Sequence, residues 1–214
     1  MGCDIHLYVE QRTENGWEAV QGINPWIARY KAFALNARER GENERAAELD
    51  RYVVEMETKE LWVYEGWLYK ERNYALFAML ADVRNNYDYK PICQPKGLPG
   101  DISDVVGKEA ARWEEDGHNH SWLTLQELLT YDWDQTTTIT GWVEKNVADK
   151  YRQTGKRPSY WFYDTTNRNN NYEQISWQVK YSEHVQQFLD YGLLKLKQYA
   201  CPPEDIRIVF WFDN

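Results

Sequence analysis

The stretch that decides the fold is Cys3-Asp4-Ile5-His6-Leu7-Tyr8-Val9-Glu10, in which apolar side chains occupy every second position. Successive side chains of a strand point to opposite faces, so this alternation predicts a half-buried strand. Asn15-Gly16 follows, which is a strong signal for a two-residue hairpin turn. We therefore expect the chain to return as a second strand over residues 17–20.

Several stretches have helical composition or helical spacing. Asn24-Pro25 is a favourable helix start, because proline is well suited to the first helical position. Helical composition continues to about Glu57 and is broken near Gly41, which predicts two helices. Further helices are expected at residues 73–83, 103–115 after the cap Ser103, 124–131, and from Ser182 onward. A short hairpin is expected over residues 61–70.

The closing stretch 206–212 predicts another strand, as do residues 136–143 and 172–179. Residues 85–100 and 116–122 are expected to be loops. Because both ends of the chain predict strands, we expect them in one central sheet. Hairpins mixed with segregated helices favour an α+β fold, with a mostly antiparallel central sheet and helices packed around it. A length of 214 residues fits a single domain over 1–214.

Charge and composition limit the partners. The chain has 34 acidic and 25 basic residues, a net charge of −9, and no basic stripe. Duplex nucleic acid is therefore not an expected partner, because phosphate neutralisation supplies most of the affinity of duplex binders. Three widely spaced cysteines fit reduced thiols. Neither a membrane-spanning run nor a signal peptide is visible, so we expect a cytoplasmic protein that does not enter a membrane.

Aromatic residues are abundant: 16 Tyr, 11 Trp and 6 Phe. One interpretation is that these rings fill the core and cover its edges. The other is that some of them line a cleft that stacks a base or a sugar. The sequence leaves both open.

Two short motifs concentrate potential metal ligands. Asp4 and His6 share one face of the first predicted strand, about 6.6–6.8 Å apart along it. His118 and His120 are spaced for chelation from an extended segment, with Asp116 beside them. Imidazole and carboxylate donors suit a divalent ion, zinc or manganese before others. The alternative is that the first motif is the polar face of an edge strand and the second a helix-capping turn.

A set of segments spread from end to end carries a resemblance. These are Met1–Glu10, Arg72–Ala78, Ala81–Asn85, Lys96–Pro99, Asp116–Thr124 and Val209–Asn214. Together they resemble an uncharacterised family of phage and prophage proteins, with MGCDIH at the N-terminus and DGHxHSWLT within the chain. The resemblance implies a bacterial host cytoplasm during infection, where small phage proteins often antagonise host defence or handle nucleotides. It implies no catalytic residue.

Two functions follow as hypotheses. The first is a metal-dependent hydrolase of a small phosphate-containing or nucleotide-like substrate, with the ion on the two motifs. In it Asp116 orients a histidine or acts as base, and Arg84 meets the anion. Trp122 and Asn85 contact the ligand. The alternative is a non-catalytic phage protein that sequesters a small nucleotide signal or blocks a host defence protein.

Overall fold

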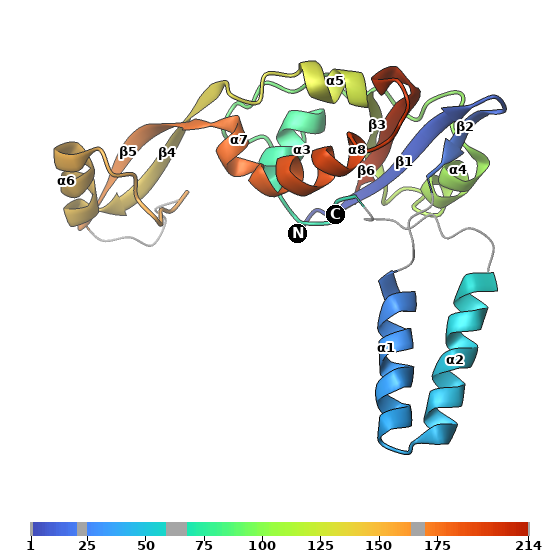
Figure 1. Cartoon of the computed structure of the whole chain (residues 1–214). Coiled ribbons are helices and arrows are strands. Elements are labelled where there is room, and N and C mark those ends of the chain that lie inside the picture. The colour runs from blue at the N-terminus through green and yellow to red at the C-terminus, as the bar shows by residue number, and fades with distance from the viewer. Residues whose placement is uncertain (1, 21–24, 59–67, 164–169, 214) are drawn as a thin grey trace. The chain divides into compact units, whose positions relative to one another are not determined.

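The computed structural model describes residues 2–20, 25–58, 68–163 and 170–213 (Figure 1). Within it the chain divides into two compact units, each built from segments that are distant in sequence. The first unit comprises residues 1–72, 96–126 and 195–214, and the second comprises residues 73–95 and 127–194. The single domain expected over 1–214 stays a prediction.

The first unit contains a four-stranded sheet in the order β2-β1-β6-β3. Its strands are β1 (Ile5–Thr13), β2 (Gly16–Ala19), β3 (His118–Thr124) and β6 (Ile206–Phe212). Every neighbouring pair is antiparallel, and the two terminal strands β1 and β6 lie side by side. The predicted α+β fold, with both terminal strands in one antiparallel sheet, is confirmed.

Strand β6 forms the centre of this unit, since all seven of its residues are buried. One face of the sheet packs against α4 (Asp104–Ala111), where Tyr8, Val209 and Trp211 contact Val106 and Ala110. The Ser103 hydroxyl accepts a hydrogen bond from the Val106 amide at 3.4 Å, so the predicted cap is confirmed. The helix ends at residue 111, four residues before the expected end.

The prediction of a loop over residues 116–122 is wrong, because β3 already begins at His118. The register of β3 against β6 shifts between His118 and Ser121. Asn119 has a φ of 50°, in the left-handed region that asparagine tolerates better than most residues. This β-bulge breaks the alternation of side chains that identifies a strand in sequence.

Helices α1 (Pro25–Glu39) and α2 (Asn43–Thr58) pair as a hairpin. The chain reverses at Gly41, whose φ of 76° places it in the left-handed region that glycine adopts without strain. The predicted break is confirmed. Most of the hairpin expected over residues 61–70 lies outside the described residues. No helix in the described part of the chain is long and apolar enough to cross a membrane.

The second unit contains an antiparallel ribbon of β4 (Thr136–Glu144) and β5 (Tyr172–Lys180). Helix α6 (Lys145–Thr154), which the sequence analysis missed, packs Ala148 against the apolar side of this ribbon. The remaining helical elements of the described chain are α3 (Tyr74–Ala81), α5 (Leu125–Thr130), α7 (Tyr181–His184), a π-helix at Phe188–Leu193, α8 (Leu194–Leu196) and a 3-10 helix at Pro203–Asp205. The helix expected from Ser182 onward is therefore divided into three short pieces.

Candidate functional site

The sheet brings the two histidine motifs to opposite sides of β6. His6 on β1 pairs with Trp211, and His118 on β3 pairs with Phe212. Both motifs therefore lie at the same end of the sheet, but Trp211 and Phe212 point to opposite faces, so His6 and His118 lie on different faces. This proximity could not be derived from the sequence.

Asp4 is engaged by an arginine of the same unit. Its two carboxylate oxygens accept hydrogen bonds from Arg72, at 2.8 Å from Nε and 2.5 Å from Nη2. The guanidinium lowers the pKa of this carboxyl, chiefly through the hydrogen bond. A metal ion at Asp4 would have to compete with this bidentate pair.

His6 is buried between two indoles and has a carboxylate neighbour of its own. Its ring centroid lies 3.8 Å from that of Trp113 and 5.8 Å from that of Trp211. Nε2 is 3.4 Å from Oδ2 of Asp213, whose other oxygen accepts the Asp4 amide at 2.9 Å. Asp213, which the sequence analysis did not select, thus ties the end of β6 to the first motif.

The bulge in β3 directs His118 and His120 towards different neighbours. The His118 ring lies 6.1 Å from Phe212, whereas the His120 ring lies 5.7 Å from Trp211. Burial, followed by the charge of His118, lowers the pKa of His120. Nδ1 of His118 hydrogen-bonds the Asn119 side chain at 2.6 Å, and its buried Nε2 has no hydrogen-bond partner in the described part of the chain.

The described residues contain no group of three or more histidine, cysteine or acidic side chains placed to hold a metal ion. The set Asp4, His6, His118 and His120, and the divalent ion that it would bind, therefore remain predictions. Asp116 is exposed on the turn before β3, where its amide donates to the Trp113 carbonyl at 2.8 Å.

Arg84 and Asn85 belong to the second unit. Arg84 is exposed and has a φ of 54°. The Asn85 amide donates to Asp82 at 2.7 Å and to the Tyr89 carbonyl at 2.8 Å, and its oxygen accepts the Tyr89 amide. These bonds fix a local turn, and the catalytic and ligand-binding roles of the two residues remain predictions.

Trp122 lines an open cavity of about 480 Å³ in the first unit. Tryptophan rings and cationic side chains lie next to one another around this cavity. Lys96 Nζ lies 4.1 Å from the centroid of Trp122, and the Arg207 guanidinium lies 5.6 Å from Trp122 and 4.0 Å from Trp17. Arg12 lies 4.9 Å from Trp17 on β2. The cavity thus offers aromatic and cationic side chains side by side.

Arg207 is held rigidly at the base of this cavity. It is 2% exposed and donates to Glu10 Oε2 at 2.7 Å and to Asp101 Oδ1 at 2.8 Å. Glu10 is fully buried, and its other oxygen accepts the Ser103 amide at 2.8 Å. The hydrogen bond from Arg207 also lowers the pKa of Asp101. The ion pair therefore connects β1 and β6 to the segment before α4.

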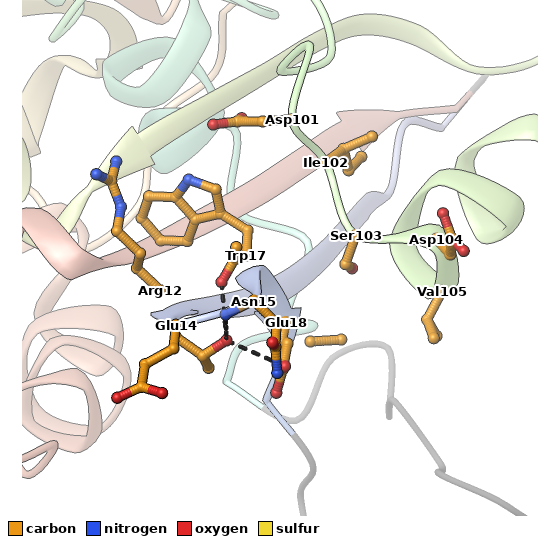
Figure 2. Close-up of a pocket in the computed structure, with 13 residues that line it drawn as sticks. Arg12, Glu14, Asn15, Trp17, Glu18, Asp101, Ile102, Ser103, Asp104 and Val105 are labelled. Carbon is orange, nitrogen blue, oxygen red and sulfur yellow. Dashed lines mark hydrogen bonds between the residues drawn. The ribbon is translucent and has the colours of Figure 1, made fainter.

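A second cavity of about 810 Å³ adjoins the first and shares Arg12, Trp17 and Asp101 with it. Figure 2 shows it between the β1–β2 hairpin and the segment from Asp101 to Val105. Its remaining charged lining is acidic, contributed by Glu14, Glu18 and Asp104. The smaller cavity is lined by the carboxylates of Asp101 and Glu204 as well as by its cations, and only this cavity contains Lys96 and Trp122.

Among the residues that line the smaller cavity, Trp122 is the one that the sequence analysis selected. A signal for Arg207 is present, since a single charge interrupts the apolar run 206–212 and a buried charge needs a partner. Lys96 and Trp17 carry no comparable signal, because their proximity depends on strand order.

Comparisons with known proteins give no assignment. A scan against protein-family models finds no match, and searches of curated proteins and of solved structures find no similar protein.

Proposed function

We propose that this protein binds a small nucleotide-like ligand in the Trp122 cavity and holds it without chemical change. The observation that supports this proposal is the set of Trp122, Lys96 and Arg12 around one open cavity. An indole offers a face on which any base stacks, and ammonium and guanidinium groups attract phosphate.

Binding of the ligand would replace the present contacts of Lys96 and Arg12 with stronger contacts to phosphate. Lys96 Nζ now lies over the Trp122 ring, and a base stacked there would move this ammonium towards the phosphate. Arg12 is exposed and pairs with Asp205 at 3.5 Å, a surface ion pair that a phosphate can replace. The buried Arg207 would stay in place, because Glu10 and Asp101 hold it.

The size of the cavity and the charge of the chain agree with a small ligand. A volume of about 480 Å³ falls in the range typical of small-molecule sites. The net charge of −9 disfavours a long polyanion, which would meet repulsion beyond the cavity. Together with the resemblance to phage proteins, this supports sequestration of a small nucleotide signal, and hence a counter-defence role in a bacterial cytoplasm.

Calorimetric titration with AMP, ATP and a cyclic dinucleotide tests the proposal. We expect one of these probes to bind and to be recovered unchanged after long incubation. Trp122→Ala should weaken binding at least about fivefold, because stacking of a base on an aromatic ring is worth about 1–3 kcal/mol, and Lys96→Met should weaken it by removing a charge that attracts phosphate. Lys108→Met is the matched control, since Lys108 is an exposed lysine on α4 outside the cavity. Equal affinities for all four proteins would contradict the proposal.

Metal-dependent hydrolysis is the second candidate. Its support is the buried Nε2 of His118, which has no hydrogen-bond partner in the described residues, and the His6–Asp213 pair between β1 and the end of β6, although the register places His6 and His118 on different faces of the sheet. Elemental analysis of untagged protein tests it. One equivalent of zinc or manganese that is lost in His118→Ala, together with breakdown of a bound nucleotide, would replace the binding proposal with the hydrolase. Intact ligand and no metal after soaking would remove the hydrolase.

A further inference from the structure

Small side chains and ion pairs lie between the two helices of the α1–α2 hairpin. Among its described side chains the buried ones are Ala34, Ala37, Ala46 and Val53, and Ile27, Leu49 and Met56 are half-buried. Lys31 Nζ lies 2.7 Å from Glu57 Oε1, and Arg38 pairs with Asp50. The small side chains at the buried positions allow the two helices to approach closely.

Large aromatic side chains instead gather on one side of the hairpin. Phe33 of α1 is 45% exposed and Tyr52 of α2 is 46% exposed. Both rings adjoin Tyr30, with centroids 6.3 Å and 6.2 Å away. These three residues form a continuous surface across both helices, which we name the aromatic face. Contiguous exposed apolar surface of this kind marks contact sites.

The two edges of the aromatic face carry opposite charges. On the α1 edge the Arg29 guanidinium lies 5.4 Å from the Phe33 ring. On the α2 edge Glu48 accepts a hydrogen bond from the Tyr52 hydroxyl at 3.3 Å. Over their whole lengths α1 has three basic residues and one acidic, whereas α2 has two basic and five acidic, with Lys31 and Arg38 already paired to Glu57 and Asp50 within the hairpin.

We infer that the aromatic face is the docking surface for a second copy of this chain. A two-fold axis through the face brings α1 of one copy against α2 of the other, so Arg29 meets Glu48 twice. The rings of both copies then become buried in the centre of a four-helix bundle. The face is complementary in charge to itself, which favours a second copy over a different protein. This inference is independent of the ligand proposed for the Trp122 cavity.

Sedimentation velocity of the untagged whole chain over a concentration series tests the apolar part of this inference. Wild type is expected to form dimers, and Phe33→Glu should raise the dissociation constant at least about tenfold. Leu35→Glu is the matched control, because Leu35 is also exposed on α1 but lies about 200° around the helix from Phe33. A wild type that stays monomeric, or a Phe33→Glu variant that dimerises as wild type does, overturns the inference.

Charge exchange tests the geometry without depending on any one variant's stability. Arg29→Glu alone places acidic groups opposite each other, and Glu48→Arg alone places basic groups opposite each other, so each should remain monomeric. An equimolar mixture of the two restores both contacts in a heterodimer. Failure of the mixture to dimerise while wild type does so would place the interface elsewhere and overturn the inference.

Discussion

Replacing Arg207 with methionine removes the charge that balances Glu10 inside the first unit. Glu10 is fully buried, and after the change its carboxylate keeps only the Ser103 amide at 2.8 Å. Breaking a buried ion pair by removing one partner costs about 3–5 kcal/mol. For a chain of this length, that destabilisation lowers the melting temperature by about 10 °C. Methionine retains most of the packing volume, so the loss reports on charge.

Urea denaturation followed by tryptophan fluorescence measures this loss. The double variant Glu10→Gln/Arg207→Met should recover part of the stability, because no unpaired buried charge remains. Arg12→Met is the control, since its exposed pair with Asp205 contributes less than about 1 kcal/mol. If Arg207→Met lies within about 1 kcal/mol of wild type, the reasoning about this buried pair is refuted.

Three further predictions concern other parts of the chain. Burial lowers the pKa of His184, so protonation favours the unfolded state. Stability should therefore be lost as the pH falls below about 6.5, and His184→Asn should reduce this dependence in thermal melts at several pH values, with His120 accounting for the rest. Arg72→Ala should raise the pKa of Asp4, which an NMR titration measures. The same change should alter the free energy of unfolding by less than about 1 kcal/mol, because the Arg72–Asp4 pair is half-exposed. Gly141→Ala should destabilise the β4–β5 ribbon by about 1–3 kcal/mol in urea denaturation, because the new methyl group would lie 3.0 Å from Trp161 Cβ.

The two terminal strands of the sheet were predictable because they carry their own pattern. Residues 3–10 alternate, residues 206–212 form an apolar run, and each is bounded by turn or proline signals. That the two strands pair with each other is shown by the structure. The cap at Ser103 and the break at Gly41 are equally local, and both are confirmed.

What the sequence could not supply depends on contacts between distant segments. His118 begins a strand despite its polar neighbours, because β6 pairs with it and the bulge at Asn119 absorbs one residue. Arg72 engages Asp4 across 68 positions, and Asp213 approaches His6 across the sheet. Lys96 and Trp17 reach the Trp122 cavity only through strand order. No spacing rule connects such positions.

NMR of protein labelled with ¹⁵N in its tryptophan indoles tests the binding proposal most directly. Titration with the nucleotide that binds best in calorimetry should shift the Trp122 indole signal, assigned by its loss in Trp122→Phe, and to a lesser extent that of Trp17. The signal of Trp142, on β4 of the second unit, should stay unchanged. Shifts confined to other indoles, or none at saturating nucleotide, would contradict a ligand site at the Trp122 cavity.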